Sequence, residues 1–402
     1  MSAEARAWLA ENADQRATDE DDWSRFKFFG DPSPEADAEH VRQCKEWQRK
    51  LFDGGWAGIT WPTEYGGRGG TPAEARVFAQ EQARFDVSAG TFAVGIGMVG
   101  PTLMVHGTED QKKRYLPALL RGDDVWCQLF SEPGAGSDLA GLRTRAVRDG
   151  DEWIVNGQKV WSSGAHHSDL GILLARTDVD QPKHRGITYF VLDMTTPGVD
   201  VRPLRQITGV AHFNEVFLTD VRIPAENVVG EVNGGWSVAH TTLGNERQLI
   251  GSGGGMVGFS DYARLAREQG RAGDVEVRQR LADAYIRFEI QKFLGLRVQG
   301  ALRGGKQPGP EMSVLKLSVS RNVALNGDLA LALEGASGML QYDAAPYGGF
   351  WQQQFLNQWG VRIGGGTEQV QRNVMGERVL GLPGEPRPDK SLPFRELPSS
   401  GA

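Results

Sequence analysis

The order of hydrophobic and polar residues divides the chain into three zones and a tail. Ala- and Glu-rich stretches alternate with Gly/Pro loops over residues 1–122, which predicts a helical domain. Short apolar runs separated by turn residues predict a β domain over residues 123–234. Apolar positions three and four apart predict a helical bundle over residues 235–380, and the proline-rich residues 381–402 are expected to form an extended surface tail. This order indicates an α+β fold rather than an alternating doubly wound sheet.

Apolar runs in the central zone predict strands with turns between them. Asn156-Gly157 and Pro197-Gly198 are the dipeptides expected to turn the chain. The predicted strands lie at residues 153–155, 170–174, 188–192 and 215–218.

Residues 87–105 form the longest uncharged stretch, nominally long enough to cross a bilayer. The stretch contains serine, threonine, proline and four glycines, so we expect a buried pair of helices instead. Residues 1–22 are polar and acidic, without the basic and apolar regions of a secretory signal. We therefore predict neither export nor a membrane span.

Composition narrows the class of protein. With 402 residues the chain can bury a large core without disulfides, and its only cysteines, Cys44 and Cys127, fit a reducing, cytoplasmic setting. A formal net charge of −7 argues against binding to nucleic acid or to an anionic membrane. Glycine accounts for 53 of 402 residues, against an average near 7%. This excess predicts many close backbone approaches or a loose chain.

Some motifs in the sequence are misleading. Residues 95–100 and 253–258 both match Gly-x-Gly-x-x-Gly, but neither lies between a predicted strand and a helix as a dinucleotide site requires. We interpret them as glycines that let helices pack closely. The adjacent His166 and His167 are expected to point in different directions, so we predict no metal site.

Two loops carry candidate chemistry. Residues 131–138, Ser-Glu-Pro-Gly-Ala-Gly-Ser-Asp, form a turn whose N–H groups can converge on an anion or a heteroaromatic edge, beside two hydroxyl groups. Residues 161–164, Trp-Ser-Ser-Gly, place a flat ring and hydroxyl groups at the start of a β segment. Either motif alone is equally compatible with an ordinary Gly/Ser loop.

Glu246 lies on a predicted helix with Leu243 three residues before it, and Leu249 and Ile250 after it. A carboxylate on such an apolar stripe would have a raised pKa and would be a better base near neutrality. Arg247 projects about 100° away on the same helix. A salt-bridged structural glutamate is the alternative interpretation.

Residues 364–369, Gly-Gly-Gly-Thr-Glu-Gln, precede a helical run. A Gly-rich loop leading into a Thr-capped helix is suited to a phosphate or an oxyanion. The alternative is a plain helix cap.

Together these motifs resemble the acyl-CoA dehydrogenase family over residues 36–383. The resemblance implies an N-terminal helical domain, a central β domain and a C-terminal four-helix bundle. It also implies FAD between the β domain and the bundle, and usually a homotetramer. The segments that resemble the family, in the family's order, are residues 51–71, 99–138, 156–177, 214–236 and 364–372.

The resemblance further implies roles for individual residues. The implied cofactor contacts are Leu129 and Ser131 at the flavin pyrimidine edge, Gly136 and Ser137 in the same loop, Trp161 and Ser163 near N5, and Thr367 and Gln369 at the phosphates. The implied substrate contacts are Ser137, Gly244, Arg247 and Gly365, with Arg247 near the CoA part.

Three departures from the family pattern matter. Most members have a catalytic glutamate at the position of Gly365, whereas Glu246 here occupies the alternative base position of isovaleryl-CoA and long-chain enzymes. The Arg-x-Gln-Phe-Gly segment that reaches the neighbouring subunit's FAD is absent near residues 270–274, and Ala332 replaces a usual glutamine. Similar losses occur in bacterial heteromeric members that act on steroid side-chain thioesters.

We therefore expect an FAD-dependent dehydrogenase that converts an acyl-CoA to the trans-2-enoyl-CoA, with Glu246 as the base. Electrons would pass to an electron-transfer flavoprotein, and the assembly would be a homo-oligomer or a heterotetramer with a second acyl-CoA dehydrogenase chain. Two alternatives stay open: a catalytically degenerate subunit of a heteromer, and a flavin oxidase or monooxygenase. Acyl-chain length, branching and steroid character are not specified by the sequence.

Overall fold

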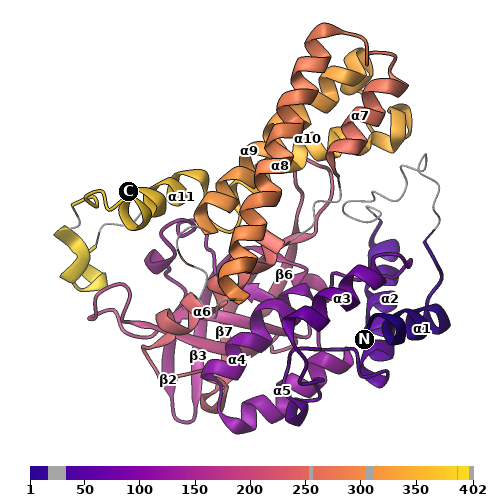
Figure 1. Ribbon diagram of the computed structural model, residues 1–402. Coiled ribbons are helices and arrows are strands. Elements are labelled where there is room, and N and C mark those ends of the chain that lie inside the picture. Colours follow the sequence, from indigo (N-terminus) through magenta and orange to yellow (C-terminus); the bar gives the residue numbers. More distant parts are fainter. Residues whose placement is uncertain (17–32, 253–256, 304–308, 310–311, 387, 398–402) are drawn as a thin grey trace. The chain divides into compact units, whose positions relative to one another are not determined.

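The computed structural model describes residues 1–16, 33–252, 257–303, 309, 312–386 and 388–397. Among these residues the chain forms two compact units. The first contains residues 1–16, 33–245 and 388–397, and the second contains residues 246–386. Figure 1 colours them along the sequence, from indigo at the N-terminus to yellow at the C-terminus.

The helices of the first unit precede its sheet, as the sequence predicts. Capping boxes start two of them, with Thr71 paired to Glu74 and Thr108 paired to Gln111, so orphan N–H groups of the first turn are bonded. The helices are α1 (Ser2–Asn12), α2 (Pro34–Asp53), α3 (Pro72–Gln82), α4 (Gly100–His106) and α5 (Glu109–Arg121).

Helix α1 is an element that the sequence pattern does not predict. Ala5 and Leu9, one turn apart, are its fully buried side chains. The ring of Trp8 lies 5.7 Å from that of Trp47 on α2. Packing against the neighbouring helices therefore stabilises a segment whose own periodicity is weak.

Residues 87–105 do not form the expected pair of helices. A π-helical segment (Gly95–Val99) runs directly into α4, so the second half of the stretch is one continuous helix. Pro101 cannot donate the usual hydrogen bond, and the five-residue spacing of the preceding turn, in which Gly100 N–H bonds to the Gly95 carbonyl, accommodates it. None of the described helices combines the length and apolar character needed to span a membrane.

The sheet of the first unit has seven strands in the order β1-β4-β2-β3-β7-β6, with β5 paired to β4. The β1–β4 and β2–β4 pairs are parallel and the others antiparallel. Figure 1 shows β2, β3 and β7 side by side. The strands are β1 (Trp126–Leu129), β2 (Arg145–Asp149), β3 (Glu152–Ser163), β4 (Leu170–Arg176), β5 (Ile187–Asp193), β6 (Val199–Leu204) and β7 (Phe213–Pro224).

One of the two predicted turns is wrong. Pro197-Gly198 does lie between strands, but Asn156-Gly157 lies inside β3, at a shift in its register with β7. Asn156 is held there by two hydrogen bonds with Asp220 of β7, and a side chain at position 157 would collide with Thr144. The β2–β3 turn is instead made at Gly150, which has φ 59°.

The second unit is helical. Its core contains Leu265, Leu329, Leu333 and Trp351, each at most 2% exposed. Helix α6 begins in the first unit and ends in the second. The helices are α6 (Gly235–Ser252), α7 (Phe259–Glu268), α8 (Val275–Arg303), α9 (Met312–Glu334), α10 (Phe350–Ile363) and α11 (Glu368–Val374).

Part of the predicted tail packs on the first unit. Phe394 is buried, and the guanidinium of Arg176 lies 3.7 Å from its ring centre. The backbone N–H of Phe394 donates to the Gln181 carbonyl. Residues 388–397 are therefore integrated into the β domain rather than only resting on its surface.

Candidate functional site

The predicted site residues fall into two sets, one on each compact unit. On the first unit, the 131–138 loop and the end of β3 are joined by main-chain bonds. Val160 N–H donates to the Ser131 carbonyl over 2.9 Å, and Glu132 and Ala135 exchange two N–H bonds inside the loop. The two motifs that the sequence singled out separately thus form one structural feature.

A buried ion pair reinforces this junction. Lys159 is completely buried, and its Nζ donates to Glu132 Oε1 at 2.8 Å and to the Phe130 carbonyl at 3.0 Å. The same carboxylate accepts the N–H groups of Arg143 and Thr144. Because every group is paired, we assign both partners as charged.

The pKa of Glu132 reflects this balance. Burial disfavours its charged form, but Lys159 and the N–H donors outweigh burial and hold the pKa of Glu132 below its usual value. Sequence reasoning missed Lys159. The one signal in the sequence is a lysine two residues before Trp161, which pattern alone assigns to solvent.

The loop residues themselves differ in what they can offer a ligand. Leu129 is fully buried in the β core, so its side chain packs inside and only its main chain can meet a cofactor. Ser131 is half-buried, and Ser137 is exposed. Around Gly136, no atom lies within 4 Å of the position a Cβ would occupy, so the backbone there is open to close approach.

Trp161 has an unusual conformation for an aromatic residue. Its φ is 62°, and the β3–β7 register shifts between Lys159 and Ser162. The left-handed region costs a non-glycine residue about 1–2 kcal/mol. The ring is 55% exposed and meets Phe213 edge-on at 5.7 Å. Ser163 next to it is exposed as well.

These residues fit a flavin ring. The strained backbone of Trp161 holds its indole about half in solvent, where the flat apolar face is available for another ring to cover. Ser131, Ser137 and Ser163 add hydroxyl groups, which can donate to or accept from the polar edge of an isoalloxazine. The junction of the 131–138 loop with β3 keeps the two segments together. The donor set therefore suits the cofactor that the resemblance implies.

On the second unit, Glu246 is half-buried within α6. The charge of the buried Lys316 of α9 interacts with that of the Glu246 carboxylate. The environment of Glu246 is therefore more polar than the apolar stripe that the sequence predicts. Burial lowers the pKa of Lys316, while the carboxylates of Glu368 and Glu246 act in the opposite direction. Gly244 has open space around it, and the side chain of Arg247 lies outside the described part of the chain. Lys316 is not among the site residues that the sequence predicts.

The 364–366 loop has the conformation that its glycines allow. Gly365 and Gly366 have φ 66° and 95°, and the Gly365 carbonyl accepts a bond from Gln371 Nε2 at 3.2 Å. Thr367 caps α11 by accepting the Val370 N–H, as the cap interpretation predicts, and Gln369 is exposed. A glutamate at position 365 would be strained in this loop.

The two other departures from the family pattern are neighbours in the structure. Arg271 donates to the Ala332 carbonyl at 2.6 Å and pairs with Asp274 at 2.9 Å. Residues 270–274, which lack the Arg-x-Gln-Phe-Gly segment, therefore contact Ala332, which replaces the usual glutamine.

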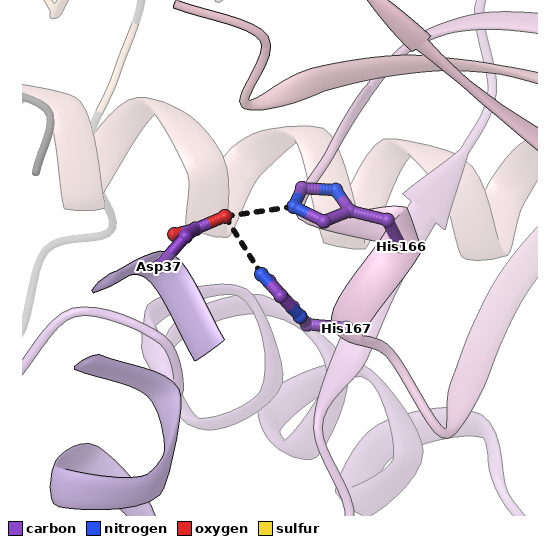
Figure 2. Close-up of side chains that lie close together, drawn as sticks. All are labelled: Asp37, His166 and His167. Carbon is purple, nitrogen blue, oxygen red and sulfur yellow. Dashed lines mark hydrogen bonds and ion pairs between the residues drawn. The ribbon is translucent and has the colours of Figure 1, made fainter. Parts of the chain in front are cut away.

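The expectation that His166 and His167 point apart is wrong. Both Nε2 atoms lie within 2.9 Å of Asp37 Oδ2, as Figure 2 shows. The two residues form a 3₁₀ turn (Ala165–His167), in which neighbouring side chains do not alternate between opposite faces as in a strand. Among the described residues this is the one group of His, Cys, Asp and Glu side chains that could hold a metal ion.

Comparison with known proteins identifies relatives along the whole chain. Residues 31–123, 127–221 and 233–380 match the acyl-CoA dehydrogenase N-terminal, middle and C-terminal domains, respectively. Acyl-CoA dehydrogenase FadE34 of Mycobacterium tuberculosis is 43% identical over 84% of this chain, which spans 46% of the length of FadE34. Acyl-CoA dehydrogenase IpdE1 of the same organism is 38% identical over 95% of this chain and 97% of its own.

Solved structures agree with these matches. The Tcur3481-Tcur3483 steroid ACAD has a TM-score of 0.80 and 32% identity, covering 96% of this chain and 97% of the other. The ChsE4-ChsE5 complex from Mycobacterium tuberculosis has a TM-score of 0.74 and 30% identity, covering 96% of this chain and 98% of the other. Both confirm the expected fold.

Proposed function

Because the chain belongs to the acyl-CoA dehydrogenase family, we propose that it oxidises an acyl-CoA thioester to the trans-2-enoyl-CoA with Glu246 as the base. Members of this family are flavin-dependent oxidoreductases. One observation carries the base assignment. Of the two positions from which family members supply the base, one is Gly365, in a loop with φ 66°, and the other is Glu246.

The chain's own groups divide the chemistry between them. Glu246 removes the α-proton onto its carboxylate, and the nearby positive charge of Lys316 favours the unprotonated form that the base needs. The Gly365 N–H stabilises the charge that develops on the thioester oxygen. Trp161 and Ser163 would hold the flavin ring in place. Bound FAD would accept the β-hydride at N5, and an electron-transfer flavoprotein would then take the electrons.

Anaerobic titration tests this assignment. Adding an acyl-CoA to the purified flavoprotein should bleach the flavin absorbance, and Glu246→Gln should slow bleaching by at least about 10²-fold, the usual contribution of a general base. Glu276→Gln, an exposed glutamate at the start of α8, is the matched control and should bleach like wild type. Equal rates for Glu246→Gln and wild type would show that another group is the base.

For the substrate, we propose a bulky thioester such as one bearing a steroid side chain. The support is the similarity to a structure described as a steroid ACAD. A screen of straight-chain, branched and steroid acyl-CoA thioesters should give the highest kcat/KM for the steroid class. A straight-chain optimum would refute this choice of substrate and leave the dehydrogenation itself intact.

A second candidate role is that of one chain in a heteromeric dehydrogenase. It is supported by the adjoining departures at Arg271 and Ala332, and by the two-chain names of the similar Tcur3481-Tcur3483 and ChsE4-ChsE5 structures. The FAD content of the purified chain distinguishes the roles. One FAD per chain supports a self-sufficient enzyme, whereas colourless protein that gains FAD only with a second acyl-CoA dehydrogenase chain supports the heteromer.

A further inference from the structure

The cluster of Asp37, His166 and His167 lies outside the chemistry proposed above, although it adjoins the end of β3 that carries Trp161. Asp37 comes from the first turn of α2, and both histidines come from the turn after β3. Figure 2 shows one carboxylate oxygen facing both rings. Two histidines and one carboxylate can bind a metal ion. The hydrogen-bond partners of these side chains therefore distinguish a metal site from a hydrogen-bonded cluster.

Asn214 sets which ring nitrogen of His166 carries the proton. Asn214 is fully buried on β7, and its Nδ2 lies 3.1 Å from the Ser162 carbonyl and 2.9 Å from His166 Nδ1. The two amide N–H groups donate to these two nearer acceptors, while the His212 carbonyl lies farther from Nδ2, at 3.5 Å, so His166 Nδ1 is the acceptor and carries no proton. The proton of His166 is therefore on Nε2, where it is donated to Asp37.

This arrangement disfavours a metal ion. An ion bound at His166 Nε2 would move the proton to Nδ1, where it would face the N–H of Asn214. Turning the Asn214 amide over would place its oxygen against the Ser162 carbonyl instead. The contacts instead describe a hydrogen-bonded cluster, in which both imidazoles donate to one carboxylate.

The same contacts form a continuous path to the strained end of β3. Asp37 accepts from His166, His166 accepts from Asn214, and Asn214 donates to the carbonyl of Ser162. Ser162 stands between Trp161, with φ 62°, and the exposed Ser163. A strained backbone persists only where its surroundings hold it.

We propose that Asp37, His166 and Asn214 are positioning residues that hold residues 161–164, at the end of β3, in the conformation needed for the flavin ring. The inference deepens the proposed function and rests on it for the identity of the ring. Asp37 is exposed enough to be replaced without opening the core, because its side chain is 38% exposed. His167 also donates to Asp37 but has no contact with Asn214 that the described structure shows, so it lies off the path.

Hydrogen exchange measured by mass spectrometry tests the path without cofactor. In the apoprotein, Asp37→Ala and His166→Ala should speed exchange of the Gly164 amide, which donates to the His212 carbonyl, by at least about tenfold. Glu35→Ala, which removes a carboxylate from the same turn of α2, is the matched control. It and His167→Ala should exchange like wild type. Unchanged exchange in Asp37→Ala and His166→Ala would overturn the proposal.

FAD and metal titrations complete the test. Asp37→Ala and His166→Ala should raise the Kd for FAD about tenfold over wild type and over Glu35→Ala. Equal affinities would overturn the positioning role. Wild-type protein that binds no FAD, either alone or with a second acyl-CoA dehydrogenase chain, would instead refute the proposed function and leave the exchange result standing. Stoichiometric Zn²⁺ binding with a submicromolar Kd, lost in Asp37→Ala, would show that the cluster is a metal site and overturn the proposal.

Discussion

At the scale of single residues, the candidate site is marked by backbone conformations as much as by side chains. Trp161 and Gly365 both have positive φ values, 62° and 66°. Glycine adopts this region freely, whereas tryptophan is strained there. We propose that the strained conformation of Trp161 is retained because it places the ring where it can contact the flavin.

Replacing Trp161 by glycine should separate stability from cofactor binding. Relief of about 1–2 kcal/mol of backbone strain offsets the lost contact with Phe213 and the greater freedom of glycine in the unfolded chain. We expect the free energy of unfolding to change by less than about 1 kcal/mol in urea denaturation. FAD affinity should fall about tenfold or more, since ring stacking contributes roughly 1–3 kcal/mol.

Two variants control this prediction. Asp220→Gly changes another positive-φ position of the first unit, φ 50°, away from the candidate site and should leave FAD affinity unchanged. Trp161→Phe keeps a flat ring and should bind FAD more tightly than Trp161→Gly. If Trp161→Gly bound FAD like wild type, the ring would have no part in the cofactor site.

Residue types alone were enough to select the hydroxyl and glycine positions of the candidate site, but not the buried lysines Lys159 and Lys316. Lys159 and Lys316 are almost completely buried, and each contacts its partners from a different segment of the chain. Lysine is ordinarily a surface residue, so only the packed structure reveals that these two are inside.

At the scale of elements, continuous apolar runs predicted β4 and β5 because both are buried along nearly their whole length, and helical spacing of apolar residues predicted the long helices. Short dipeptide signals did less well. Asn156-Gly157 became a bulge within β3, since pairing with β7 outweighs the local turn preference. The same limit applies to α1, where Ala5 and Leu9 alone form the buried face.

The glycines of residues 95–100 were correctly interpreted as a close-packing device. They lie in a π-helical segment and the start of α4, not between a strand and a helix. A Cβ on Gly100 would collide with the ring of Trp61, which is 5% exposed and cannot move aside freely. A Cβ on Gly95 would likewise collide with Leu119 of α5, so the motif lets this helix pack closely against α5 and against the loop that carries Trp61.

Gly100→Ala should accordingly destabilise the protein by about 1–3 kcal/mol, the usual cost of overpacking. Gly295→Ala makes the same change within α8, where nothing lies within 4 Å of the new methyl group. It should be neutral or stabilising by up to about 1 kcal/mol, because alanine is the better helix former. Urea denaturation of both variants checks the contrast. Equal effects would mean that helix propensity, not the contact with Trp61, governs position 100.

At the scale of the whole molecule, the two compact units contain buried titratable groups with opposite pH responses. In the first unit, burial lowers the pKa of His212 to about 4, outweighing the attraction of Asp37. In the second, burial raises the pKa of Glu334 to about 7, although a hydrogen bond from Gln352 opposes the shift. Each group is kept neutral in the folded chain, one as a base and the other as an acid.

The signs follow from proton linkage. Below about pH 6.5 unfolded His212 binds a proton that the folded chain binds only near pH 4, so its contribution to stability falls as the pH falls through this window. Above about pH 4.5 unfolded Glu334 releases a proton that the folded chain keeps until about pH 7, so its contribution falls as the pH rises. Each shift corresponds to at most about 3 kcal/mol, less for the partly exposed His212.

Isosteric variants should reveal the two contributions separately. Glu334→Gln should be more stable than wild type at pH 7.5 by up to about 3 kcal/mol, with the difference shrinking towards pH 4.5. His212→Asn keeps an acceptor for Gln206, whose Nε2 lies 3.0 Å from His212 Nδ1, and should gain on wild type as the pH falls from 6.5 to 4.5. Free energies of unfolding from urea curves at four pH values test both. A variant whose profile ran parallel to wild type would show that its residue is not neutral in the folded chain for the reason given. Because the two contributions change in opposite directions with pH, the free energy of unfolding of wild type should depend less on pH than either contribution does alone.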